Sequence, residues 1–111
     1  MSTIFGKIIA KTIPADIVYE DSLLIVIKDI SPQAPVHLLI ITKKPYTSVQ
    51  DIPQDELLIV SAIVQVAQKL AKDFHISDSY RLLTNHGALA GQTIFHLHFH
   101  LIGGKELGPI A

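Results

Sequence analysis

In residues 96–102, HLHFHLI, three histidines alternate with large apolar side chains. In a β-strand, successive side chains point to opposite faces of the sheet, so this alternation predicts a strand. One face of it carries three imidazoles: His96, His98 and His100. The opposite face carries large apolar side chains: Phe95, Leu97, Phe99 and Leu101. Because the apolar face must be covered by a core, we expect the imidazoles to lie in or near a groove.

A helical repeat occupies residues 53–73, where apolar side chains recur with a period near 3.6 and cover most of the circumference. The polar positions form one narrow stripe: Ser61, Gln65, Gln68 and Lys72. Asp51 or Asp55 is expected to cap the N-terminus of this helix. Since the apolar arc is wider than one sheet face can cover, we expect further packing, for instance against a helix of another subunit.

The remaining elements are short. Ile4, Phe5, Ile8 and Ile9 have helical spacing, and Pro14 closes their segment. Strand-like runs follow, the first two forming a hairpin around Asp21 and Ser22: residues 16–20, 23–28, 37–42, 80–85 and 93–102. The sequence therefore predicts one α+β domain over residues 1–111, with a partly antiparallel sheet and one long helix on a face.

Composition excludes several classes of protein. The formal net charge is -1 and no basic run is longer than Lys43-Lys44, which argues against nucleic-acid or anionic-membrane partners. The chain has no cysteine, so thiolate chemistry and Cys-ligated zinc are excluded. The first 20 residues lack the apolar block of a secretory signal, and the longest apolar run is too short to cross a bilayer. We expect a cytoplasmic protein.

Three interpretations of the histidine row compete. The imidazoles could be polar side chains on a solvated sheet face, but histidine is seldom chosen there. They could bind zinc, although the outer pair, His96 and His100, would lie about 13 Å apart along the strand, too far to share one ion. They could perform nucleophilic and acid–base chemistry, because imidazole titrates near neutrality and forms phosphoryl adducts.

A glycine-containing loop precedes the row. In NHGALAGQT, residues 85–93, Gly87 and Gly91 permit backbone conformations that point amide hydrogens at an anion. Asn85 and Thr93 add side-chain donors. Such a loop is common in ordinary turns, but its position beside three imidazoles favours the third interpretation and predicts a phosphate site.

These motifs resemble the histidine triad superfamily, defined by His-x-His-x-His-x-x with x apolar. IFGKII, DISPQAPVHLLI, the Asn-x-Gly of NHG, and GQTIFHLHFHLIGG are similar to its Hint branch and extend the likeness over nearly the whole chain. The resemblance implies a fold of about five antiparallel strands, one long helix and a short N-terminal helix, with sheets and long helices joined across a homodimer.

The same resemblance implies a purine nucleoside phosphoramidase. Such an enzyme cleaves adenosine or guanosine 5'-phosphoramidates, and aminoacyl adenylates, to AMP or GMP without a metal or cofactor. Hydrolysis of dinucleoside polyphosphates is an alternative within the family. A purine-nucleotide-binding signalling or interaction module with incidental turnover, and a zinc protein, are alternatives from other classes.

Residue roles also follow from the resemblance. His98 is implied to be the nucleophile that carries a nucleotidyl group, His100 to contact the phosphate and leaving group, and His96 and His37 to support them. Amides from Gly91 to Thr93, with Asn85, are expected to stabilise the phosphate. The resemblance thus assigns four residues of this loop to the nucleotide site: Asn85, Gly91, Gln92 and Thr93.

The nucleoside site is implied in the same way. Asp29 is expected to accept both ribose hydroxyls, although a turn-capping carboxylate is equally compatible with Asp-Ile-Ser-Pro. The walls of the base site are assigned to apolar residues that pattern alone would place in the core: Ile4, Phe5, Ile8, Ile27 and Ile30.

Three features depart from common family patterns. His86 occupies a position where many Hint proteins carry an acid, and Ala90 replaces a frequent glycine. The C-terminal KELGPIA lacks the tryptophan of the animal proteins. His86 and Ala90 bear on the electrostatics and shape of the loop. Because the tail reaches the partner's active site in the family, its difference bears on leaving-group preference. Together these departures favour a bacterial type.

Overall fold

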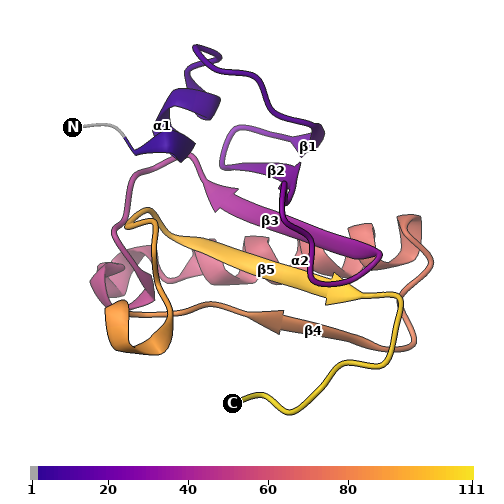
Figure 1. The fold of residues 1–111 in the computed structure, drawn as a ribbon. Coiled ribbons are helices and arrows are strands. Elements are labelled where there is room, and N and C mark those ends of the chain that lie inside the picture. Colours follow the sequence, from indigo (N-terminus) through magenta and orange to yellow (C-terminus); the bar gives the residue numbers. More distant parts are fainter. Residues whose placement is uncertain (1–2) are drawn as a thin grey trace.

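Five antiparallel strands form one sheet in the order β1-β2-β3-β5-β4. The computed structural model describes residues 3–111 (Figure 1). Its main elements are α1 (Ile4–Ile9), β1 (Ile17–Glu20), β2 (Leu24–Lys28), β3 (Val36–Thr42), α2 (Leu58–Asp73), β4 (Tyr80–Leu83) and β5 (His98–Gly103). Short 3-10 helices span Val49–Asp51, Gln54–Glu56 and Ala88–Ala90. Within residues 3–111, no helix has the length and apolarity needed to cross a membrane.

Local side-chain hydrogen bonds set two of these elements. Thr3 accepts a hydrogen bond from the Gly6 amide and caps α1. The Asp21 carboxylate accepts hydrogen bonds from the Leu23 and Leu24 amides, which turns the chain between β1 and β2. The predicted N-terminal helix and hairpin are therefore confirmed.

The sheet separates two apolar clusters, as strand alternation requires. Leu24, Val26, Leu38, Ile40 and Leu101 lie on the face that α2 covers. The opposite face carries a smaller cluster that α1 covers: Phe5, Ile8, Ile25, Ile27, Leu39 and Ile41. Figure 1 shows α2 behind the sheet and α1 over the β2 and β3 end. The predicted burial of β3 on both faces is confirmed.

The start of the last strand differs from the prediction. Regular pairing with β3 begins only at His98, opposite Ile41. β3 ends at Thr42, and Leu97 instead donates to the Tyr46 carbonyl and accepts from the Thr42 amide. As a result, Phe95 is 49% exposed and lies outside the core. The predicted alternation therefore holds for residues 97–101, and the placement of Phe95 in the core was wrong.

The start of α2 also differs. The helix begins at Leu58, after the 3-10 turn Gln54–Glu56, and no side chain caps it. The Asp51 carboxylate accepts from the Thr47 and Ser48 hydroxyls instead. Pro53 adopts an extended conformation and the 3-10 turn follows it, so the α-helix starts later than predicted. The predicted capping by Asp51 or Asp55 was wrong.

Candidate active site

His37, His98 and His100 come together on the face of the sheet opposite α2. His37 pairs with Ile102 across β3 and β5, and its ring nitrogen Nε2 lies 2.9 Å from Nδ1 of His100. The His98 and His100 ring centroids are 5.2 Å apart. Period-two alternation on two adjacent strands places all three imidazoles side by side.

The hydrogen bonds of His98 define which of its nitrogens is free. Nδ1 lies 2.7 Å from the carbonyl oxygen of His96, which only accepts, so Nδ1 carries the proton. Nε2 then has an unprotonated lone pair. Phe5 packs edge-on against the ring with centroids 4.9 Å apart, which holds the imidazole in place. His98 is therefore arranged as a nucleophile or base at Nε2.

A chain of donors fixes His37 and His100. The Gln33 amide donates to His37 Nδ1 at 3.0 Å, so His37 carries its proton on Nε2. This proton is donated to His100 Nδ1, which leaves His100 neutral with its hydrogen on Nε2. His100 thus presents a hydrogen-bond donor next to the lone pair of His98.

His96 has a different position from the one expected. It lies before β5 and is only 2% exposed. Its Nε2 donates to the Thr42 carbonyl at 2.7 Å, and its Nδ1 accepts from the Thr3 hydroxyl at 3.2 Å. Both nitrogens are occupied, so His96 supports the site by aligning the chain, and its backbone carbonyl orients His98.

Burial keeps the site histidines neutral. Desolvation lowers the pKa of His98, although the hydrogen bond to the His96 carbonyl opposes this effect. Desolvation, reinforced by His98 and His37, lowers the pKa of His100 to about 4. Desolvation also lowers the pKa of His37, against the attraction of Asp29. Neutral imidazoles match the tautomers that the hydrogen bonds require.

These shifts predict the pH dependence of any reaction in which His98 Nε2 attacks. Protonation removes the lone pair, and a lowered pKa keeps the active form at lower pH. We expect kcat/KM to stay on a plateau from pH 8 to below 6.5, the ordinary histidine pKa, and then to fall. A pH–rate profile checks this expectation. An acid limb at or above the ordinary value would contradict it.

A hollow of about 600 Å³ adjoins α1 and the ends of β2 and β3. It is lined by all of the predicted base-site residues, Ile4, Phe5, Ile8, Ile27 and Ile30. Asp29 and Thr93 also line it. Sequence reasoning missed Ile13, Leu39 and Ile94. Leu39 could have been found, because it lies two positions after His37 on the same strand face.

The Asp29 carboxylate faces the histidines from the rim of the hollow. Its Oδ1 accepts from the Ser31 amide at 2.7 Å, and Oδ2 lies 3.4 Å from His37 Nε2. Asp29 therefore caps the turn and also lines the hollow. The Ser31 bond orients the carboxylate along the rim.

The loop before β5 only partly matches its expected form. The Gly91 amide donates to the Ala88 carbonyl and the Gln92 amide to the Gly87 carbonyl, so neither is free for a phosphate. Anion binding by these two amides therefore stays a prediction that would require the loop to exchange these hydrogen bonds. In the part of the chain that the structure describes, the Thr93 amide and hydroxyl have no hydrogen-bond partner. Thr93 is therefore an available donor in this loop.

Asn85 and Gln92 play different parts in this loop. A Cβ added to Gly91, whose φ is +100°, would lie 3.6 Å from Asn85 Nδ2, so the Asn85 amide lies against the Gly91 backbone. The Gln92 side chain is buried: Oε1 accepts from the Gly87 amide, and Nε2 donates to the Thr47 and Ile94 carbonyls. Gln92 therefore shapes the loop and does not point into the hollow.

Asp29, His37 and His100 offer three potential metal ligands within 4.8 Å of one another. The donor from Gln33 argues against an ion there, because it keeps the His37 proton on Nε2, the atom that would have to bind. A metal on Nε2 would move the His37 proton to Nδ1, and the Gln33 hydrogen bond would then be lost as well.

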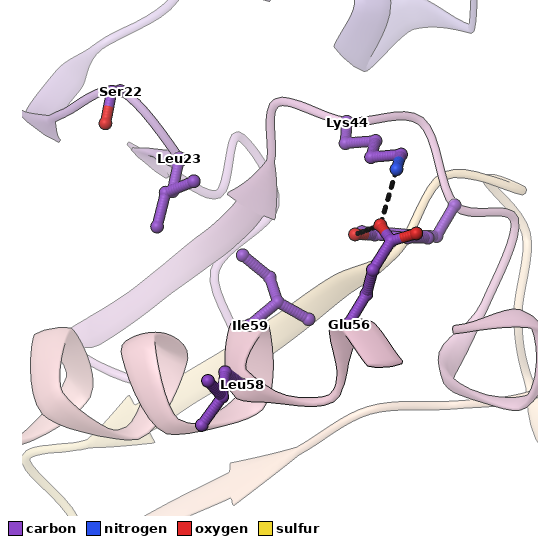
Figure 2. Close-up of a pocket in the computed structure, with 7 residues that line it drawn as sticks. Ser22, Leu23, Lys44, Glu56, Leu58 and Ile59 are labelled. Atoms are coloured by element: carbon purple, nitrogen blue, oxygen red, sulfur yellow. Dashed lines mark hydrogen bonds and ion pairs between the residues drawn. The ribbon is translucent and has the colours of Figure 1, made fainter. Parts of the chain in front are cut away.

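A second hollow lies between the β1–β2 turn and the start of α2. Figure 2 shows Leu23 and Leu58 at its walls, with the Lys44–Glu56 ion pair beside them. None of the histidines lines it.

No histidine lines the hollow at α1 either. Two of its lining residues contact the histidines, however: Phe5 packs against His98, and Asp29 lies 3.4 Å from His37. The candidate active site is therefore the hollow at α1 together with the adjacent histidines.

Comparisons with known proteins agree with this geometry. The HIT domain family model matches residues 10–107. A HIT-like protein of Chlamydia pneumoniae is 50% identical over 98% of this chain and 99% of its own length. The purine nucleoside phosphoramidase of Escherichia coli is 44% identical over 97% and 92%.

Solved structures give the same result. A HIT family hydrolase from Clostridium thermocellum superposes with a TM-score of 0.93 at 48% identity, covering 97% of this chain and 95% of the other. A histidine triad protein from Clostridium difficile gives 0.94 at 40% identity, over 100% and 97%. The five-stranded sheet, the long helix and the row of imidazoles are those of the histidine triad (HIT) family, to which this chain belongs.

Proposed function

We propose that this HIT family hydrolase is a purine nucleoside phosphoramidase that forms a nucleotidyl intermediate on His98. The observation that carries the proposal is the free Nε2 of His98, fixed by the His96 carbonyl beside a hollow lined by the predicted nucleoside residues. Identity to the E. coli phosphoramidase supports the substrate class.

In the first step, the lone pair of His98 Nε2 attacks the α-phosphorus. The P–N bond breaks, and the leaving nitrogen takes up a proton from solvent and departs as an amine. The His98 ring now bears positive charge, which the His96 carbonyl stabilises by accepting the hydrogen bond from Nδ1, 2.7 Å from its oxygen. In the second step, water attacks phosphorus and gives up a proton to solvent, the N–P bond breaks, and the nucleoside monophosphate and neutral His98 are released.

Donors around the phosphate account for the rest of the catalysis. We assign the His100 Nε2 hydrogen, the Thr93 amide and hydroxyl, and the Asn85 amide to the phosphate oxygens and leaving group. Phosphoryl transfer depends mainly on positioning and on donors aimed at these oxygens. Asp29 is assigned to the ribose hydroxyls, because its carboxylate lines the same hollow.

The substrate class is tested by comparing adenosine and guanosine 5'-phosphoramidates with dinucleoside polyphosphates, each with and without chelator. We expect the phosphoramidates to give kcat/KM at least about tenfold higher, unchanged by chelation. Faster cleavage of the dinucleoside compounds would favour the alternative hydrolase. AMP binding without turnover would favour a binding module, and loss of activity in chelator would favour a zinc enzyme.

We further propose that the protein is a homodimer formed through β4 and one flank of α2. Within residues 3–111, β4 is an edge strand that pairs with β5 alone. Val64 lies one helical turn from Gln68, which lines a hollow with Tyr80 of β4, so both helix residues face this edge. Val64 is 38% exposed and Leu57, two turns earlier, 44%. An unpaired strand beside exposed apolar side chains is a surface that a second copy can cover.

Val64→Asp is expected to convert the dimer to a monomer, because it introduces a charge into this apolar contact. Light scattering coupled to size exclusion measures the change. Leu58→Asp is the matched control: Leu58 is 82% exposed but lines the hollow on the opposite side of the helix, with Leu23. A wild-type monomer, or equal dissociation by both variants, would contradict the proposed interface.

A further inference from the structure

Three consecutive residues, Tyr46 to Ser48, each bind the segment that carries the active-site loop. The Leu97 amide donates to the Tyr46 carbonyl at 2.7 Å, and Gln92 Nε2 donates to the Thr47 carbonyl at 2.8 Å. His86 Nδ1 lies 2.8 Å from the Ser48 hydroxyl. Figure 1 shows the orange loop beside the segment that leads from β3 toward α2.

The direction of the His86 bond follows from the neighbours of Ser48. The Ser48 hydroxyl donates its only hydrogen to the Asp51 carboxylate at 2.9 Å. It must therefore accept from His86, whose proton lies on Nδ1. Ser48 is only 2% exposed, so its hydroxyl has little access to water, while Asp51 and His86 lie at the surface. Asp51, Ser48 and His86 form one directed chain that ends at the loop.

The loop depends on such polar anchors because apolar packing does not hold it. Ala88, Leu89 and Ala90 are exposed, and Leu89 is fully so. Gly87, next to His86, is bonded to Gln92 twice, through its amide and its carbonyl. Anchoring His86 therefore fixes both sides of the loop at once, and with them Thr93.

We propose that His86, held by Ser48 and Asp51, is a positioning residue that keeps the Asn85 and Thr93 donors aimed at the substrate phosphate. The inference rests on the proposed function, since it concerns phosphate recognition in the same site. Of the loop residues 85–93, only Thr93 lines the nucleoside hollow, whose other lining residues belong to other segments, so the effect of His86 is expected mainly at the phosphate end. The adenosine part of a ligand is recognised by other residues.

This separation gives a direct test by calorimetry with AMP and adenosine. His86→Ala and Ser48→Ala are expected to weaken AMP binding about tenfold, the upper range for one hydrogen bond, and to leave adenosine binding unchanged. His86→Asn is expected to restore AMP affinity to within about twofold, because the amide nitrogen of Asn occupies the place of the ring Nδ1.

Thr47→Ala is the matched control. It removes a hydrogen bond to Asp51 but retains the Thr47 carbonyl that holds Gln92. We expect AMP binding within about twofold of wild type, as for loss of one exposed hydrogen bond. Equal loss of AMP and adenosine binding in His86→Ala, no loss of either, or an equal effect of Thr47→Ala would overturn the inference. A wild-type protein that binds adenosine but not AMP, or that binds neither, would contradict the proposed function as well.

Discussion

His98→Ala is expected to lower kcat for a nucleoside phosphoramidate by about 10⁴ or more, with little change in KM. The substitution removes the one nitrogen at which the covalent bond forms. Neighbouring imidazoles are not expected to replace it, because His96 uses both nitrogens in hydrogen bonds and His100 presents a protonated Nε2. Nucleotide binding is retained, since the hollow at α1 is unchanged.

Steady-state kinetics with a fluorogenic adenosine phosphoramidate measures this loss. His75→Asn is the matched control, since His75 is exposed at the end of α2 and has φ +61°, which Asn tolerates. We expect the control to keep wild-type activity. A His98→Ala variant that retains kcat within about tenfold of wild type would rule out nucleophilic attack by this residue.

Gln92→Ala is expected to lower kcat/KM about 10²-fold and the free energy of unfolding by about 2 kcal/mol. The buried amide makes three hydrogen bonds that connect Gly87, Thr47 and Ile94. Their loss leaves two carbonyls and one amide unpaired and frees the loop that presents Thr93. Catalysis falls because the phosphate donors are no longer held in place.

Gln92→Glu tests whether the size of the side chain or its ability to donate hydrogen bonds matters at this position. Glutamate has the same size but cannot donate, and its charge would face the Thr47 and Ile94 carbonyls. We expect it to be as damaging as alanine in both kinetics and thermal unfolding. Gln65→Ala is the control, because Gln65 is exposed and bonds only to Ser61. A Gln92→Ala enzyme within about twofold of wild type would show that the loop does not need this anchor.

Most secondary structure could be predicted because it depends on local patterns. The alternation in residues 97–101, the turn at Asp21 and the helical repeat after Leu57 each set an element by short-range rules. The placement of Phe95 failed for a long-range reason. β5 can pair with β3 only as far as β3 extends, and β3 ends at Thr42. The pattern of residues 93–102 contains no information about that end.

The candidate site was predictable to different degrees. The alternation rule placed His98 and His100 on one face, and the resemblance located Asp29 and the apolar residues that line the hollow. Neither indicated that the Gly91 and Gln92 amides are used within the loop, because hydrogen-bond partners in a turn depend on its full conformation. The bond between His86 and Ser48 joins positions 38 residues apart and has no sequence signal.

The most direct measurement is to quench the reaction with an adenosine phosphoramidate within the first turnovers and to map the adduct by mass spectrometry of peptides. The account predicts an adenylyl group on the peptide that contains residues 96–102, attached to His98. Turnover without any adduct, or an adduct on another side chain, would contradict it.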